Sequence, residues 1–218
     1  MFKKIKFDTN KYNFRKLVEN YLDFQDLENI HSNYPFDGML TSSEGTNPDQ
    51  GQSLHKKFYE GMDSDKNFKS LYDDFIENII AQNFGEIIFQ KFPTFRVHQP
   101  ENICVFEWHR DCDFNHSRNE TNIYMPITKA FDTNTFWSES EEDKADFLPV
   151  EADYGEIVIW KGSILKHGNK INTTGKTRVS FDFRVMLLED YNETEAQESL
   201  TKSNKFTMGN YFDERSVG

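Results

Sequence analysis

The sequence is short of basic residues. Its 218 residues include 25 lysines and arginines against 37 aspartates and glutamates, which gives a formal net charge of -12. A nucleic-acid partner requires a basic face that neutralises phosphates, so this balance argues against one. It argues less against an anionic substrate, because a single arginine-lined pocket can differ in sign from the whole protein.

Cysteines and long apolar runs are also scarce. The two cysteines, Cys104 and Cys112, lie close together in a stretch that we expect to be extended, so they do not suggest a structural disulfide. A reducing compartment fits this usage. No segment has the length of a transmembrane helix, and the lysine-containing N-terminus lacks the apolar run of a signal peptide. We therefore expect a cytoplasmic protein with no membrane partner.

The length suits one domain, 1–218, with a core of its own. The 21 phenylalanines indicate a core built largely from aromatic rings. We expect a mainly helical support over 1–85, a β core over 86–188 and a peripheral segment over 189–218 with a helix around 193–200. The stretch 34–52 is rich in turn-forming residues and predicts a long irregular segment, either a plain surface loop or a rim over a site.

Two helices are predicted in the first part. Apolar residues recur at helical spacing from Phe14 to Leu22. A second apolar stripe runs from Phe68 to Ile80 and follows Ser64 and Asp65, either of which can cap a helix. A helix with one apolar face packs against something flat, so we expect both helices to cover a sheet.

Short β-branched and aromatic runs separated by turn residues begin at about residue 86. We expect strands at 87–89, 95–98, 103–108, 122–127, 135–137, 156–160 and 178–187. This spacing favours a sandwich or jelly roll over parallel βαβ units. The predicted class is therefore α+β with a mainly β core.

A histidine and a carboxylate stand two residues apart at His109 and Asp111, directly after the predicted strand 103–108. On an extended backbone both side chains point to the same side. With His167 from a distant strand they form a face of two histidines and one carboxylate, which is the ligand set of non-haem Fe(II) oxygenases. Gly162 and Gly168 flank that histidine and ease tight backbone near a bound ligand.

The predicted strand 178–187 alternates strictly between polar and apolar residues. Arg178, Ser180, Asp182 and Arg184 share one face, and the apolar residues between them share the other. Arg178 can hold a carboxylate with two parallel hydrogen bonds, and Ser180 can add a third donor. For Arg184, pairing with Asp182 is favoured over contact with the substrate.

The same face argument selects residues on two other strands. Asn122, which shares a face with Tyr124, is a candidate donor to the cosubstrate near the metal. Arg96 and His98 are candidates for contact with substrate or cosubstrate, and structural hydrogen bonding is an equal alternative for each. His31 and His55 lack a carboxylate at ligand spacing, and we expect them to lie at the surface. His116 lies close to His109 in sequence, but its polar loop indicates a solvent-facing position rather than a metal ligand.

An acidic run covers residues 138–146 between two predicted strands. Two interpretations are open. The run is either a solvated loop or a negatively charged flap that attracts a cationic substrate. In the second case, neutralising Glu139, Glu141 and Glu142 weakens substrate binding.

These motifs together resemble the 2-oxoglutarate/Fe(II)-dependent oxygenase superfamily, and more narrowly the small group typified by an oxygenase-like protein of streptomycin biosynthesis. The resemblance covers about residues 86–187. The segments that carry it are Pro93–His98, Phe106–Asp111, Asn122–Thr128, Thr133–Thr135, Tyr154–Glu156, His167–Asn169 and Thr174–Arg184.

The resemblance implies a double-stranded β-helix with His109, Asp111 and His167 on Fe(II). It also implies that Arg178, helped by Ser180, binds the distal carboxylate of 2-oxoglutarate, and that O2 is the oxidant. Halogenating relatives lack the carboxylate ligand, so Asp111 favours hydroxylation or desaturation. We expect a small polar metabolite, such as an amino acid, amino sugar or natural-product intermediate, to be the substrate.

Two alternatives to this enzyme remain open. One is a metal-dependent cupin enzyme that does not use 2-oxoglutarate, which would have no need of Arg178 and Ser180 as a carboxylate clamp. The other is a jelly roll that binds small molecules without turnover.

Overall fold

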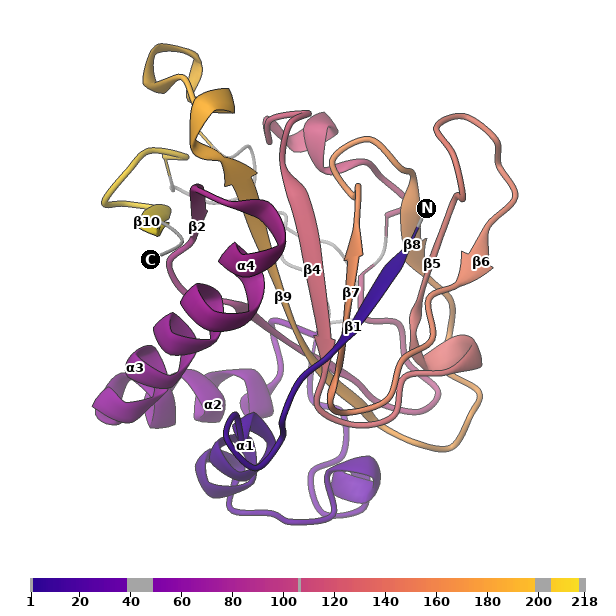
Figure 1. Ribbon diagram of the computed structural model, residues 1–218. Coiled ribbons are helices and arrows are strands. Elements are labelled where there is room, and N and C mark those ends of the chain that lie inside the picture. Colours follow the sequence, from indigo (N-terminus) through magenta and orange to yellow (C-terminus); the bar gives the residue numbers. More distant parts are fainter. Residues whose placement is uncertain (1, 39–48, 106, 199–204, 216–218) are drawn as a thin grey trace.

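The computed structural model describes residues 2–38, 49–105, 107–198 and 205–215 (Figure 1). The α-helices are α1 (Phe14–Leu22), α2 (Ser53–Ser64), α3 (Lys66–Phe75) and α4 (Ala81–Phe84), with the π-helical turn η2 (Ile76–Ile80) joining the last two. Short 3-10 turns are η1 (Leu27–Ser32), η3 (Asp111–Phe114), η4 (Asp132–Asn134), η5 (Leu188–Asp190) and η6 (Glu193–Glu195). The strands are β1 (Lys3–Lys6), β2 (Ile87–Gln90), β3 (Thr94–His98), β4 (Thr121–Pro126), β5 (Phe136–Ser138), β6 (Leu148–Pro149), β7 (Glu156–Trp160), β8 (His167–Asn169), β9 (Arg178–Leu187) and β10 (Phe212–Arg215).

The larger sheet is antiparallel and is built around β9. Its order is β1-β7-β4-β9-β2-β10, and β3 also pairs with β9. The long strand β9 lies between β4 on one side and β2 and β3, end to end, on the other. In this register Arg178 stands opposite His98, and Arg184 stands opposite Asn122. The polar residues of three neighbouring strands therefore meet on one face of the sheet.

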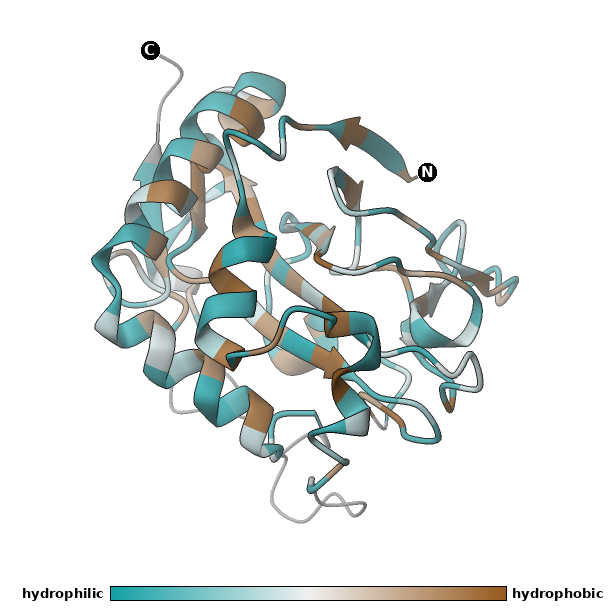
Figure 2. Ribbon diagram, turned by 90° about the horizontal axis from the view of Figure 1, so that it is seen from below, coloured by the Kyte–Doolittle hydropathy of each residue, from teal (hydrophilic) through white to brown (hydrophobic). Residues whose placement is uncertain are grey.

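The helices cover the other face of this sheet. Asn13 caps α1 by accepting from the Lys16 N–H at 3.0 Å, and Asp65 caps α3 by accepting from the Asn67 N–H at 2.8 Å. The apolar stripes of both helices pack on Phe181 and its apolar neighbours from β9 in one core. Figure 2 shows how apolar and polar residues alternate along the helices and strands of this core. The predicted aromatic core and helix-on-sheet packing are confirmed.

A smaller antiparallel sheet, of order β6-β5-β8, lies against the face of the large sheet that the helices leave open. Phe136 from β5 makes ring contacts with Tyr124 from β4 and Trp160 from β7, at centroid distances of 4.9 and 4.7 Å. The protein is thus mainly antiparallel β, with a helical layer on one side and a second sheet on the other. The polar side chains of β9 point into the space between the two sheets, where they line a cavity.

Several elements differ from the sequence predictions. Residues 103–105 and 107–108 form no regular strand, while Phe106 lies outside the described residues. The segment near residue 193 is a 3-10 turn rather than a longer helix over its described part. The two ends of the chain contribute edge strands, β1 and β10, that the sequence analysis missed. Phe206 and Phe212 pack on Ile88 and Met186, which explains why the C-terminal segment docks on the sheet.

Within the described ranges, none of the helices is long and apolar enough to cross a membrane. Residues 39–48 of the predicted irregular stretch lie outside the described residues.

Candidate functional site

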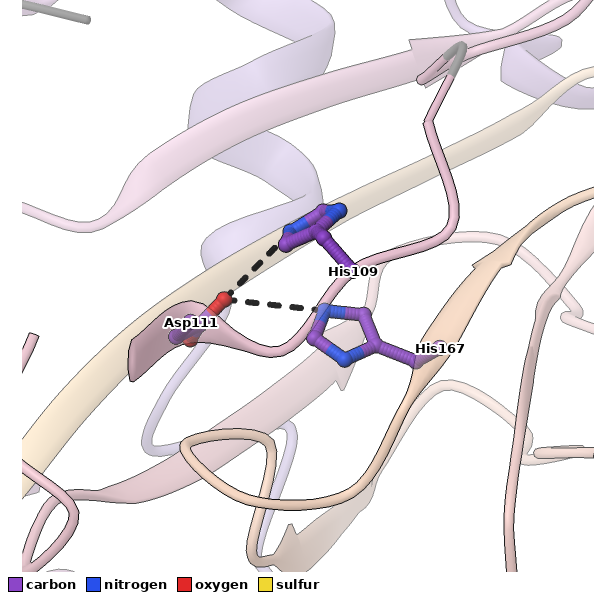
Figure 3. Close-up of side chains that lie close together, drawn as sticks. All are labelled: His109, Asp111 and His167. Carbon is purple, nitrogen blue, oxygen red and sulfur yellow. Dashed lines mark ion pairs between the residues drawn. The ribbon is translucent and has the colours of Figure 1, made fainter. Parts of the chain in front are cut away.

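His109, Asp111 and His167 come together at the end of the space between the sheets (Figure 3). One ligand atom from each lies within 4.8 Å of the other two. The backbone that leads to His109 differs from the prediction, because Glu107 and Trp108 form no regular strand. His109 forms an isolated bridge with His167, in which each backbone N–H donates to the other residue's carbonyl at 2.9 Å, and Asp111 begins the turn η3. Arg110, between His109 and Asp111, is extended, which is the local geometry expected for these two residues, and the pairing of His109 with His167 adds the third side chain.

Both histidines are oriented by their own backbone. Nδ1 of His109 lies 2.8 Å from the Glu107 carbonyl, and Nδ1 of His167 lies 2.9 Å from the Leu165 carbonyl. A carbonyl only accepts hydrogen bonds, so it fixes the tautomer with the proton on Nδ1 and leaves a lone pair on Nε2. The two Nε2 atoms lie 3.5 and 3.6 Å from Oδ1 of Asp111. Burial lowers the pKa of His167 to about 4, so this ring is neutral and can act as a ligand at neutral pH.

The two oxygens of Asp111 have different surroundings. Oδ2 accepts hydrogen bonds from Asn122 Nδ2 at 2.7 Å and from Arg184 Nε at 2.8 Å, whereas Oδ1 faces the histidines. Burial opposes ionisation of this carboxyl, but the charge of Arg184 outweighs it and holds the pKa of Asp111 well below its usual range. The carboxylate is therefore charged, with one oxygen held by the protein and the other directed at the candidate metal position.

This arrangement changes the roles expected for Asn122 and Arg184. We expected Asn122 to meet the cosubstrate and Arg184 to pair with Asp182 or meet the substrate. Both line the cavity and donate to Asp111, and Arg184 Nη1 also lies 4.0 Å from Asp182. The alternation along β9 places Arg184 on the same face as Arg178 and so predicts that it enters the cavity. Alternation alone does not identify the residue that Arg184 contacts there.

Arg178 and Ser180 stand together at a second corner of the cavity. The Arg178 side chain is buried; its Nε donates to the Asn134 carbonyl at 3.1 Å, and Nη1 donates to Ser180 Oγ at 2.8 Å. The Tyr124 hydroxyl lines the same cavity, is buried, and has no hydrogen-bond partner among the described residues. A buried donor without a partner is costly, so this corner suits an anionic ligand that accepts from all three groups.

Arg96 and His98 have structural partners. Arg96 lines the cavity but donates to Asp182 at 3.0 Å and forms an ion pair with the fully buried Asp49 at 3.3 Å. His98 lies behind the cavity wall, with Nδ1 3.0 Å from the Asn134 carbonyl and Nε2 2.8 Å from the Asn102 carbonyl. Burial and the charge of Arg178 lower the pKa of His98 to about 3. Both ring nitrogens of His98 contact backbone carbonyls, which favours the structural alternative for this residue.

One cavity contains these groups. Trp160 and Phe136 form an aromatic wall, and Trp160 meets the ring of His167 at a centroid distance of 4.7 Å. A concave site with an aromatic wall and a few placed polar groups is typical of small-molecule sites.

Gly168 was expected to ease the backbone near a ligand. A Cβ there would lie 2.6 Å from the Trp108 ring, so the glycine makes room for this side chain, and it also lines the cavity.

The contacts of the two cysteines, His116 and His31 place these residues outside the ligand set. Cys104 and Cys112 are both free thiols, as expected. His116 pairs with Glu120 at 2.8 Å and packs on Phe206, so it is not the surface residue that we expected. His31 contacts Thr177 Oγ1 at 2.8 Å and is also partly buried.

The acidic run 138–146 is a compensated loop rather than a free negative surface. Glu142 pairs with Arg118 at 2.7 Å, Glu141 pairs with Lys144 at 3.4 Å, and Asp143 pairs with Arg110. Glu139 is only 2% exposed and is bound by backbone N–H groups. The described residues that line the cavity come from other segments, so the contacts favour the loop over the substrate flap.

Known structures share the fold. The non-heme alpha ketoglutarate dependent carbocyclase SnoK from nogalamycin biosynthesis matches with a TM-score of 0.55 at 12% identity, covering 100% of this chain and 92% of that one. The non-heme monooxygenase ThoJ in its apo form matches with a TM-score of 0.51 at 11% identity, covering 98% of this chain and 85% of that one. Identities this low bear on the fold alone.

No family model matches the chain. A curated relative, the streptomycin biosynthesis protein StrG of Streptomyces griseus, is 30% identical over 210 residues, which cover 96% of each chain. A relationship at this identity over nearly the whole length places the two proteins in one family. The chain therefore belongs to the family of the streptomycin biosynthesis protein StrG.

Proposed function

We propose that the protein is a non-haem Fe(II) oxygenase that uses 2-oxoglutarate and O2 to hydroxylate a small polar metabolite. The observation that carries the proposal is one cavity with two separate sets of groups. His109, Asp111 and His167 form a ligand face, and Arg178 with Ser180 forms a carboxylate clamp. A metal site alone, as in a cupin enzyme without this cosubstrate, gives no reason for the buried clamp.

The donor set fits a divalent iron. Two neutral imidazoles and one carboxylate are the ligands of the facial triad, which leaves coordination positions open for other ligands. The Nε2 atoms of His109 and His167 and Oδ1 of Asp111 would hold the metal. The contacts of the opposite atoms, Nδ1 of each ring and Oδ2, orient the ligands before the metal arrives.

The second corner fits the distal carboxylate of 2-oxoglutarate. Arg178 supplies a charge-assisted donor, and Ser180 and Tyr124 supply hydroxyl groups. Among these, only the Tyr124 hydroxyl is left without a partner in the described chain, so a bound carboxylate satisfies it. The oxo-acid end of the cosubstrate would then point along the cavity toward the ligand face.

Iron supplies the oxidative chemistry, in which 2-oxoglutarate is decarboxylated to succinate and CO2 and one oxygen atom is delivered to the substrate. The chain's own contribution is to bind and orient. Arg178 positions the cosubstrate, Arg184 and Asn122 fix Asp111, and the aromatic wall of Trp160 and Phe136 excludes water. The presence of Asp111 leaves no ligand position for a halide, which favours hydroxylation or desaturation over halogenation.

A double-stranded β-helix is the fold that this proposal implies. The antiparallel pairing of the large sheet, the small sheet facing it and the likeness to SnoK support it.

The substrate is proposed as small and polar. The cavity is small, and beyond the clamp and the triad it presents Arg96, Asp182 and Asn169 along with its aromatic wall. The acidic run 138–146 gives no support for a cationic group on the substrate, because its acidic side chains are paired within the protein. A substrate with several hydroxyl or amine groups matches the mixed donors and acceptors that remain.

Succinate release tests the proposal. Protein reconstituted with Fe(II) is incubated with 2-oxoglutarate in air, with and without a panel of amino acids, amino sugars and polyols. We expect slow succinate formation alone and faster formation with at least one panel member. Succinate formation that stays at the level of metal-free protein, with no dependence on Fe(II), would reject the proposed function.

A further inference from the structure

The acidic segment 138–146 contacts both stretches of chain that carry the candidate metal histidines. Its first acidic residue, Glu139, directly follows strand β5 and is 2% exposed. In β5, Ser138 stands opposite His167 in the small sheet. The segment therefore begins beside one ligand and crosses toward the other.

Glu139 makes four contacts in this position. Its backbone N–H donates to the Lys166 carbonyl at 3.0 Å, and its Oε2 accepts from the Lys166 N–H at 2.9 Å. Its Oε1 accepts from the Ala145 N–H at 3.1 Å, which closes the acidic loop on itself. Oε2 also lies 3.8 Å from Nη2 of Arg110.

The residues that Glu139 contacts are direct sequence neighbours of the two candidate metal ligands. Lys166 immediately precedes His167, and Arg110 immediately follows His109. The two histidine stretches are also joined by the isolated bridge between His109 and His167. In addition, the N–H groups of Asp111 and Cys112 donate to the Gly162 and Ser163 carbonyls at 3.0 and 3.1 Å. A buried carboxylate that binds both sides extends this pairing by one more layer.

Three further contacts attach the same loop to the histidine stretches. Asp143 pairs with Arg110, and Glu142 pairs with Arg118 beyond η3. Phe147, just after the segment, meets Trp108 edge-on at a centroid distance of 4.6 Å. Trp108 in turn lies on Gly168, next to His167.

We infer that Glu139 is a positioning residue for the two metal-binding histidines, and that the acidic segment serves as a brace for the ligand face rather than as a substrate flap. The inference rests on the proposed function, because the histidines are taken as metal ligands. Groups that orient first ligands without touching the metal typically change metal affinity 10- to 100-fold when they are removed. The expected effect of losing Glu139 is therefore on metal binding before it is on substrate binding.

Co(II) alone is the probe, with its visible absorption spectrum as the signal. Metal-free wild type, Glu139→Gln and Glu141→Gln are titrated with Co(II) without cosubstrate. Glu141 is the matched control, because it lies in the same segment and pairs only within it, with Lys144 at 3.4 Å. We expect Glu139→Gln to bind Co(II) at least tenfold more weakly with an altered spectrum, and Glu141→Gln to bind within about twofold of wild type.

Folding is checked by near-UV circular dichroism of the metal-free proteins. Should Glu139→Gln not fold, the same Co(II) titration is carried out on Glu139→Asp. This variant keeps the charge but is too short to reach the N–H groups of both Ala145 and Lys166. Weaker Co(II) binding by the folded variant supports the inference, and affinity and spectrum equal to wild type overturn it. Absence of Co(II) binding by wild type itself would instead overturn the proposed metal site, so the two failures are distinguishable.

Discussion

Arg184 Nε donates to Asp111 Oδ2 at 2.8 Å, so the candidate carboxylate ligand is held from behind by a guanidinium that itself stands on β9. Asn122 holds the same oxygen from β4. The second oxygen, Oδ1, is left to face His109 and His167 at 3.5 and 3.6 Å. Arg178 stands on the same strand as Arg184. Strand β9 therefore connects the ligand face to the proposed carboxylate clamp.

Replacing Arg184 with lysine tests this support. A lysine carries the charge but lacks the planar fork that reaches Asp111, so the carboxylate loses its fixed orientation. We expect metal affinity to fall about 10- to 100-fold, read by Co(II) titration. Arg15→Lys is the control, since Arg15 binds Glu28 at 2.8 Å far from the cavity and should leave metal affinity alone. Equal metal affinity in Arg184→Lys and wild type would contradict the assigned role.

Replacing Arg178 with methionine tests the clamp. Truncating one partner of a buried charge pair costs about 2 to 5 kcal/mol, so the KM for 2-oxoglutarate should rise at least about thirtyfold. Binding of Co(II) alone should change little, because Arg178 does not contact the ligand face. Steady-state succinate formation over a range of 2-oxoglutarate concentrations gives the answer. An unchanged KM would favour the cupin alternative, in which no keto-diacid is bound.

Tyr124→Phe separates a ligand-binding hydroxyl from a structural one. The Tyr124 hydroxyl is buried without a partner in the described chain, so removing it should leave stability equal or slightly higher. With the cosubstrate present, the lost donor should raise the KM for 2-oxoglutarate by about 10- to 150-fold, from about 1.5 to 3 kcal/mol for one hydrogen bond to a charged group. Urea unfolding and cosubstrate kinetics are measured on the same preparation. A loss of stability with no change in KM would show that the hydroxyl has a structural partner instead.

His98 gives a pH dependence with a defined sign. Burial and Arg178 lower its pKa to about 3 although the carbonyls of Asn102 and Asn134 at its two ring nitrogens favour the charged form, whereas an unfolded histidine titrates near 6.5. The unfolded state therefore takes up a proton that the folded state does not, and the stabilisation present above pH 6.5 is lost as the pH falls from there toward 3. From pH 6.5 to 5 this histidine alone should remove about 1.5 kcal/mol from the free energy of unfolding.

The measurement is urea unfolding of the metal-free protein at both pH values, compared with His98→Gln. The variant should lose about 1.5 kcal/mol less than wild type over this interval, whatever its absolute stability. An equal pH dependence in the two proteins would show that His98 is not held neutral in the fold.

Much of the fold could be predicted because the periodicity of the sequence is strong. The stripe of α1 and the alternation along β9 depend on local patterning, and both elements have the expected bounds. The edge strands could not be found this way. β1 is mostly exposed and rich in lysine, so its apolar pattern is weak, and its pairing with β7 depends on a partner more than 150 residues away.

The candidate ligands were also predictable, but their surroundings were not. His109 and Asp111 were selected at the end of a strand that the described part of 103–108 does not form, although Arg110 between them is extended and an isolated bridge joins His109 to His167. Asn122 was assigned to the cosubstrate and Arg184 to Asp182 or the substrate, whereas both donate to Asp111. Glu139 was considered only as part of the acidic run, whereas it binds the stretch that leads into His167. A polar face shows that a side chain enters a site, while its partner is decided by tertiary register.

The central claim is that one iron and one keto-diacid share the cavity between His109, Asp111, His167 and Arg178. Visible absorption of the anaerobic protein with Fe(II) and 2-oxoglutarate tests it most directly. The account predicts a weak charge-transfer band that requires all three components and is lost in His109→Ala. No band in wild type, or the same band in His109→Ala, would contradict it.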